Sequence, residues 1–170
     1  MIYRVLDHGD VYNYRSDIFK CYKDCNLIFD NQSIISFDCT EDSENFLHNY
    51  VEAKDSIVVG ILDNNEEFLY GVVIFDNIRL CNKSCAQVHI VTDKAIWGRK
   101  IKDIYKEMLE TSVFDTLYCE IPKIAVNAIA MCKRLGFKKT GYIPDALPYT
   151  NSKGEEKMYD LQIYTWRRNK

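Results

Sequence analysis

A run of glycine and basic residues after an apolar segment is the clearest sign of chemistry in this sequence. A strand is predicted over 86–91, and the run that follows it reads Trp97-Gly98-Arg99-Lys100. A helix that begins here would present unpaired N–H groups and the positive end of its dipole to the preceding loop. Such helix starts bind phosphates, so this segment is predicted to hold an anionic, phosphate-bearing ligand.

Three side chains in the same half of the chain could carry acid–base chemistry. His89 lies within the predicted strand, and its imidazole, which titrates near pH 6.5, is suited to act as a general base. Glu120 lies in the next predicted strand, over 116–121, and is an alternative base. Cys132 lies in the helix after that strand and carries a titratable thiol. Each residue also has a structural interpretation: a hydrogen-bonded core histidine, a solvated carboxylate and a packed thiol, respectively.

The order of these elements, which closes on Leu135-Gly136-Phe137, resembles that of the GNAT superfamily of acyl-CoA N-acyltransferases. The resemblance covers roughly residues 56–166 and is greatest to the short GNAT-like proteins that bacteriophages encode. It implies that acetyl-CoA is the co-substrate and that the backbone at Ile90 and Val91 lies along its pantetheine arm and thioester. It also implies that the pyrophosphate contacts the loop and helix start formed by Trp97, Gly98, Arg99, Lys100, Ile101 and Lys102.

The sequence departs from the family pattern in this loop and in the following helix. The family loop usually reads Arg/Gln-x-x-Gly-x-Gly/Ala, and here Trp97 takes the Arg position while Lys100 and Lys102 replace the glycines. Glycine lets the backbone approach a phosphate closely, whereas lysine supplies a cation that can pair with it. The second family block, Asn-x-x-Ala-x-x-x-Tyr-x-x-x-Gly-Phe, has Cys132 at the position of the Tyr that protonates the coenzyme A thiolate.

The resemblance therefore leaves two functions open. The first is direct transfer of an acetyl group from acetyl-CoA to an amine on a small molecule or a protein, which fits a sequence without an obvious activated nucleophile. The second is a catalytically degenerate phage protein of the same fold, a pseudoenzyme that serves as a virion or assembly component or binds a host protein. A loop predicted over 144–154 is expected to contact the acceptor, and Tyr142, Tyr149 or Tyr159 beside it could replace the missing acid.

Composition excludes several other classes of protein. The net charge of −3 argues against a dedicated nucleic-acid-binding protein, which would normally be basic. No apolar run approaches the roughly 18 residues of a membrane span, and the N-terminus does not resemble a signal peptide. The seven cysteines form no Cys-x-x-Cys pair and are expected to be free thiols in a reducing compartment. The protein is therefore predicted to be cytoplasmic, in the host cytoplasm or in a virion if a phage encodes it.

Hydrophobic periodicity predicts the elements that must position these residues. Helices are expected over 16–27, 43–53, 98–111 and 125–135, and strands over 1–5, 56–62, 68–75, 86–91, 116–121, 138–143 and 157–166. Strands on both sides of the last two helices require crossover connections and some parallel pairing. Residues 1–170 are thus predicted to form a single α/β (α+β) domain of GNAT-like architecture. Its central sheet is expected to be mixed and mostly antiparallel, with about six to seven strands and helices on both faces.

Overall fold

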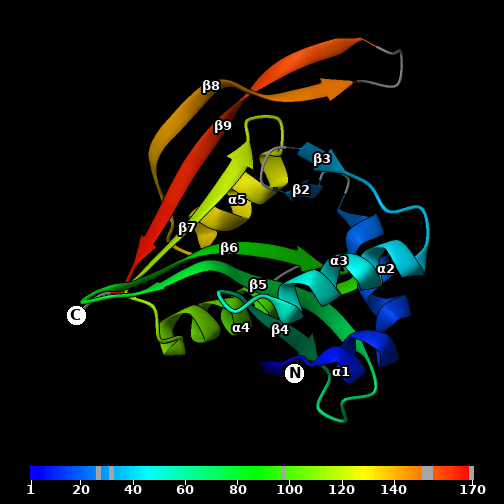
Figure 1. The fold of residues 1–170 in the computed structure, drawn as a ribbon. Coiled ribbons are helices and arrows are strands. Elements are labelled where there is room, and N and C mark those ends of the chain that lie inside the picture. The colour runs from blue at the N-terminus through cyan, green and yellow to red at the C-terminus, as the bar shows by residue number, and fades with distance from the viewer. Residues whose placement is uncertain (26–27, 31–32, 97–98, 151–154, 169–170) are drawn as a thin grey trace.

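A seven-stranded sheet runs through the centre of the molecule in the computed structural model, which describes residues 1–25, 28–30, 33–96, 99–150 and 155–168 (Figure 1). The strand order is β1-β4-β5-β6-β7-β9-β8. Only β6 and β7 are parallel neighbours, so the predicted mixed, mostly antiparallel sheet is confirmed. The strands are β1 (Ile2–Val5), β4 (Ile57–Leu62), β5 (Leu69–Leu80), β6 (Ser84–Thr92), β7 (Thr116–Pro122), β8 (Lys138–Thr150) and β9 (Glu156–Arg167).

Helices cover both faces of the sheet, as predicted, and each face has its own apolar core (Figure 1). One core packs the strands against α4 (Arg99–Thr111) and α5 (Val126–Arg134). The other core packs them against α1 (His8–Asn13), α2 (Arg15–Asp24) and α3 (Thr40–Glu52). The apolar stripe predicted for α4 is buried at Ile101, Tyr105, Met108 and Leu109, which explains why this helix lies flat on the sheet.

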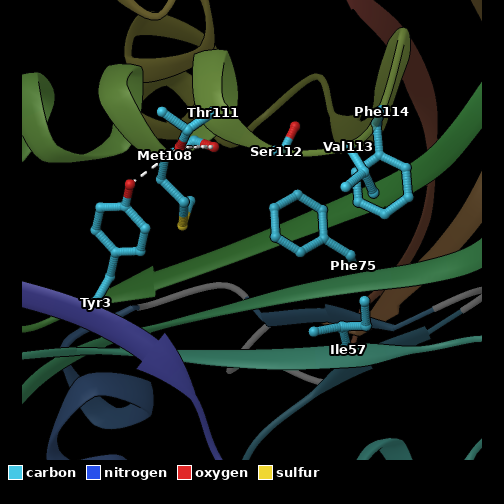
Figure 2. Close-up of a pocket in the computed structure, with 8 residues that line it drawn as sticks. All are labelled: Tyr3, Ile57, Phe75, Met108, Thr111, Ser112, Val113 and Phe114. Carbon is cyan, nitrogen blue, oxygen red and sulfur yellow. Dashed lines mark hydrogen bonds between the residues drawn. The ribbon is translucent and has the colours of Figure 1, made fainter.

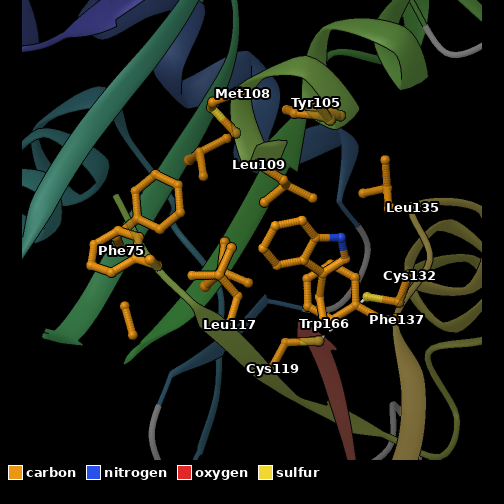
Figure 3. Close-up of a cluster of buried hydrophobic side chains, with 14 of the residues drawn as sticks. Phe75, Tyr105, Met108, Leu109, Leu117, Cys119, Cys132, Leu135, Phe137 and Trp166 are labelled. Atoms are coloured by element: carbon orange, nitrogen blue, oxygen red, sulfur yellow. Dashed lines mark hydrogen bonds between the residues drawn. The ribbon is translucent and has the colours of Figure 1, made fainter. Parts of the chain in front are cut away.

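Side chains of β7 alternate between the two faces, as a strand requires. Leu117, Cys119 and Ile121 are buried in the core beside α4 and α5, together with the aromatic side chain of Trp166 from β9 (Figure 3). Tyr118 and Glu120 therefore project from the opposite face, the one that α1, α2 and α3 cover. This alternation decides on which side of the sheet each candidate catalytic residue acts.

A glycine ends α5, the helix predicted over 125–135. Gly136 has a φ of 91°, a left-handed conformation that glycine adopts without strain. The N–H of Gly136 donates to the carbonyl of Lys133, and the N–H of Phe137 donates to the carbonyl of Cys132. This pair of bonds is a Schellman motif, and it fixes the last turn of α5, including Cys132, against β7.

The helix predicted over 16–27 is present as α2, which ends earlier, at Asp24. A further helix that was not predicted, α1, precedes it and begins at a capping box in which the Asp7 side chain accepts from the Asp10 N–H. A two-stranded hairpin of β2 (Ile28–Asp30) and β3 (Ser33–Ile35) follows, which the sequence analysis did not predict. Strands this short carry too few alternating residues for a period-2 pattern to stand out.

The structure also overturns the loop predicted over 144–154. Strand β8 continues to Thr150 and pairs with β9 as far as Glu156, with irregular register between Ile143 and Leu147. Pro144 and Pro148 suggest a turn, but β8 is an edge strand, where proline costs no ladder bond on the open side. Residues 151–154 lie outside the described residues.

No helix within the described residues is long and apolar enough to span a membrane.

Burial of β7 in the larger core leads to a direct test. Leu117 is fully buried and Leu80, also in a strand, is 73% exposed. Leu117→Ala is expected to lower the free energy of unfolding by about 2–5 kcal/mol because it leaves a cavity, whereas Leu80→Ala should change it by less than about 0.5 kcal/mol. Urea unfolding followed by circular dichroism measures both. Equal losses in the two variants would contradict this account of the core.

Candidate functional site

The ladder between β6 and β7 is short, and its early end creates the candidate site. Only Cys85–Thr116, Ala86–Leu117 and Gln87–Tyr118 are paired. Beyond Gln87, β6 continues beside β5 as far as Thr92, and β7 continues beside β9 as far as Pro122. Figure 1 shows the two strands leaving a common end and diverging. Within the part of the chain that the structure describes, the edge of β6 at Ile90 and Val91 therefore has no strand beside it on the β7 side.

A buried aspartate fixes the turn that leads from β6 into α4. The N–H of Asp93 donates to the carbonyl of Tyr70, and its carboxylate accepts from Lys20 Nζ at 2.6 Å. A single 3₁₀ turn, η1 (Lys94–Ile96), follows. These contacts fix the residue that follows β6 against β5 and α2. Asp93 was not among the site residues predicted from the sequence. Its position, a carboxylate directly after an apolar strand, was the available signal for a site residue.

The predicted phosphate-binding residues fall at the start of α4. Arg99 and Lys100 form the first turn of the helix, and their side chains lie outside the described part of the structure. Trp97 and Gly98 also lie outside the described residues. Ile101 is fully buried in the core, so only its backbone could face a ligand, while Lys102 is partly exposed. The helix is 13 residues long, so its N-terminal dipole is fully developed.

His89 projects from the face of the sheet that α3 covers. In the β5–β6 ladder it pairs with Ile74, which belongs to the core on that face. Its Nε2 lies 4.0 Å from Asp76 Oδ2, its ring centroid lies 6.3 Å from that of Tyr50, and its side chain is 18% exposed. The imidazole is thus largely enclosed and lies beside a carboxylate.

Asp76 was not predicted as a site residue from the sequence. A small network of hydrogen bonds holds its carboxylate. The N–H and Nδ2 of Asn77 donate to the two oxygens of Asp76 at 2.6 and 3.2 Å, and the same Nδ2 donates to Gln87 Oε1 at 3.1 Å. Asn77 has a φ of 51° where the β5–β6 register is irregular. An aspartate inside an otherwise apolar strand was the available signal, but its contact with His89 depends on the strand register.

Glu120 shares a face of the sheet with His89. Gln87 and Tyr118 are parallel-ladder partners, so residues two further along each strand, His89 and Glu120, project from that same face. Burial raises the pKa of the half-buried Glu120 carboxyl. Burial also raises the pKa of Tyr118, and the nearby Glu120 charge adds to this effect. The two candidate bases therefore flank the opening, one from each strand.

Cys132 lies on the opposite face, against β7. It belongs to the core beside α5, and its Sγ lies 3.4 Å from Sγ of Cys119 (Figure 3). The hydrogen bond between the two thiols, together with burial, raises the pKa of Cys119 well above the ordinary thiol range. The candidate acid and the candidate bases are thus on different faces, and the opening between β6 and β7 separates them.

The three tyrosines predicted near the late loop lie on the β8–β9 hairpin instead. Tyr142 is 62% exposed, and the rings of Tyr149 and Tyr159 lie 5.9 Å apart, centroid to centroid, near the far end of the hairpin.

Two surface pockets lie away from these residues. One, of about 210 Å³, lies between the sheet and the C-terminal end of α4, where the Tyr3 hydroxyl meets Thr111 Oγ1 at 3.0 Å (Figure 2). The other, of about 330 Å³, is lined by Lys123, Lys139, Tyr142, Asp160 and Gln162. The second pocket includes Tyr142, one of the tyrosines predicted as a possible acid, and neither pocket is lined by His89, Glu120 or Cys132. Among the described residues no group of three or more His, Cys, Asp or Glu side chains could hold a metal ion.

Comparison with solved structures identifies the fold. A point mutant of spermidine N-acetyltransferase SpeG from Vibrio cholerae matches 98% of this chain and 95% of its own, with a TM-score of 0.70 and 13% identity. An acetyltransferase of the GNAT family from Streptococcus pneumoniae covers 98% of both chains, with a TM-score of 0.66 and 15% identity. The ribosomal-protein-S5-alanine acetyltransferase of Vibrio fischeri covers 98% and 92%, with a TM-score of 0.69 and 14% identity.

These likenesses show that the chain has the GNAT fold. No protein-family model and no curated protein matches the sequence.

The half-buried Glu120 gives a pH-dependent prediction. Because its pKa is raised in the folded state, the ionised carboxylate opposes folding at pH 7, and this cost disappears below the ordinary glutamate pKa of about 4.3. Glu120→Gln removes the charge and is expected to raise Tm at pH 7 by about 1–3 °C, with the gain shrinking to nothing near pH 4.

Differential scanning fluorimetry between pH 4 and pH 8 measures this gain. Glu156→Gln, at an exposed position of β9, is the matched control and should leave Tm unchanged. A gain from Glu120→Gln that is the same at every pH would contradict a raised pKa.

Proposed function

We propose that the chain is an acetyl-CoA-dependent N-acetyltransferase that passes the acetyl group directly to an amine. The observation that carries this proposal is the early end of the β6–β7 ladder, directly before the start of α4. The structural neighbours support the same activity, since those reported above are N-acetyltransferases or acetyltransferases by name.

The residues present fit an extended ligand with an amide-rich arm and a diphosphate. The edge of β6 at Ile90 and Val91 offers backbone groups to the arm, in the way that an added strand would use them. The first turn of α4 offers its N–H groups, with Arg99, Lys100 and Lys102 as cations for the phosphates. Trp97 and Gly98 are proposed to complete this contact. Coenzyme A supplies the activated thioester, and the chain positions it.

We place the acceptor amine on the face of the sheet that α3 covers. His89 and Glu120 flank the opening there, and either can take the proton that the amine loses as it bonds to the acetyl carbon. The β2–β3 hairpin, which is in contact with β8, lies at the same side and would bound the acceptor. The neighbours named above acetylate spermidine and a ribosomal protein, so polyamines and protein N-termini are the first acceptors to test.

The leaving thiolate is proposed to receive its proton from Cys132. This thiol lies in the core on the other face of the sheet, at the position that the family resemblance gives to the acid. The contact with Cys119 provides a second thiol proton behind it. With the acid on one face and the bases on the other, C–N bond formation and C–S bond cleavage would each have a proton partner nearby.

A second candidate function is a non-catalytic protein of the same fold, encoded by a phage and acting in assembly or on a host protein. The packing of Cys132 in the core favours this candidate, because a buried thiol at this position can have a purely structural role. Exposed apolar side chains on the β8–β9 hairpin, at Tyr142, Ile143 and Met158, would then contact a protein partner.

Binding of acetyl-CoA separates the two candidates. At 100 times its Kd the ligand should add about 2.7 kcal/mol of stability, a rise in Tm of about 5–10 °C for a chain of this size. Arg99→Glu should reduce the rise, and Lys106→Glu, an exposed site further along α4, should not. The absence of any shift with acetyl-CoA, propionyl-CoA and coenzyme A would favour the non-catalytic candidate.

Kinetics test the assigned roles. His89→Ala and Cys132→Ala are each expected to lower kcat by about 10²–10⁴, because each removes a proton-transfer group, while the Kd for acetyl-CoA stays nearly unchanged. Thiol release with 5,5′-dithiobis(nitrobenzoate) measures the rate. His8→Ala and Cys39→Ala alter exposed residues of the same types and serve as controls. Full activity in both active-site variants would refute the roles while leaving the reaction class intact.

A further inference from the structure

Two buried thiols lie in contact where β7 meets α5. Sγ of Cys119 and Sγ of Cys132 are 3.4 Å apart, and the residues are 5% and 8% exposed. Both elements are well anchored: Cys119 pairs with Tyr164 in the β7–β9 ladder, and the Schellman motif at Gly136 fixes the last turn of α5. The sulfur contact is therefore a stable feature of the fold.

We propose that Cys119 and Cys132 form an oxidation site. When a low-molecular-weight disulfide reacts with them, the two cysteines become joined by a reversible intramolecular disulfide. The two sulfurs need to approach by about 1.4 Å to reach the bonded distance of about 2.05 Å. Both side chains must rotate toward each other for the bond to form.

The two thiols have different roles in the exchange: one attacks the reagent, and the other then resolves the mixed disulfide. Sγ of Cys119 donates to the carbonyl of Tyr164 at 3.9 Å, so its proton is engaged by the backbone of β9. The contact with Cys132 and burial also raise the pKa of Cys119. The first nucleophile is then Cys132, and Cys119 is the resolving thiol.

The exchange balances in two steps. In the first, the Cys132 thiolate attacks one sulfur of R–S–S–R, the S–S bond of the reagent breaks, and a Cys132–S–S–R mixed disulfide and one R–S⁻ are formed. In the second, Cys119 gives up its proton and attacks the Cys132 sulfur, which expels the second R–S⁻. Both leaving thiolates take up the protons that the cysteines lost. The cysteine pair is oxidised by two electrons, and R–S–S–R is reduced to two R–SH.

Regulation of the acetyl transfer proposed above would follow, and this step rests on that proposal. A disulfide removes the S–H of Cys132, so the group assigned to protonate the leaving thiolate is lost. If the opening between β6 and β7 binds coenzyme A, coenzyme A disulfide would be brought to Cys132, whereas glutathione disulfide would have to reach it by diffusion alone. Both reagents react by the same thiol–disulfide exchange, but only coenzyme A disulfide would be bound beside Cys132 before it reacts.

The experiment incubates the reduced full chain with coenzyme A disulfide or with glutathione disulfide, alkylates the remaining thiols and maps the peptides by mass spectrometry. The expected result is a linked Cys119–Cys132 peptide that dithiothreitol removes. Coenzyme A disulfide should form it at least about tenfold faster, because binding raises the effective concentration. Cys39→Ser and Cys81→Ser, which alter exposed thiols, should leave the link unchanged.

The wild-type map needs no variant to fold. If Cys39 and Cys81 take up mixed disulfides while no linked Cys119–Cys132 peptide forms, the proposal is overturned. In Cys119→Ala, coenzyme A disulfide should leave a stable mixed disulfide on Cys132, and its appearance on another cysteine instead would refute the order of attack. A link that forms equally fast with both reagents, in a chain that does not bind acetyl-CoA, would support the oxidation site and refute the acetyltransferase proposal.

Discussion

The early end of the parallel ladder between β6 and β7 is the constraint on which the rest of the site depends. After three residue pairs each strand follows a different neighbour: β6 stays with β5, and β7 pairs along its whole length with β9. Antiparallel pairing on both outer sides offsets the loss of the central hydrogen bonds, so the sheet opens without losing its core. Separate apolar clusters on the two faces hold it in that form.

This opening also explains how polar residues on opposite faces could act on one ligand. His89 and Glu120 lie on the face that α3 covers, and Cys132 lies on the α5 face. In a closed sheet the backbone would separate them. Where the strands diverge, a ligand that lies between them can reach both faces, so a proton can be removed on one side and donated on the other.

Local patterns in the sequence were sufficient to predict the long helices and strands. The helices predicted over 98–111 and 125–135 and the strands predicted over 56–62 and 68–75 each depend on patterns of residues a few positions apart, and the structure has α4, α5, β4 and β5 there. Prediction failed where a distant partner decides the conformation. Strand β8 runs through Pro144 and Pro148 because β9 supplies its hydrogen bonds, and the β2–β3 hairpin is too short to give a pattern.

The sequence by itself determined which chemical groups the chain carries, the order of its elements and the place where a helix start follows a strand. Tertiary structure alone decided which of those groups meet. Asp76 reaches His89 because of the β5–β6 register, and Cys119 reaches Cys132 because α5 folds back on β7. Neither contact follows from local propensity, because strand register and helix packing are set by burial over the whole sheet.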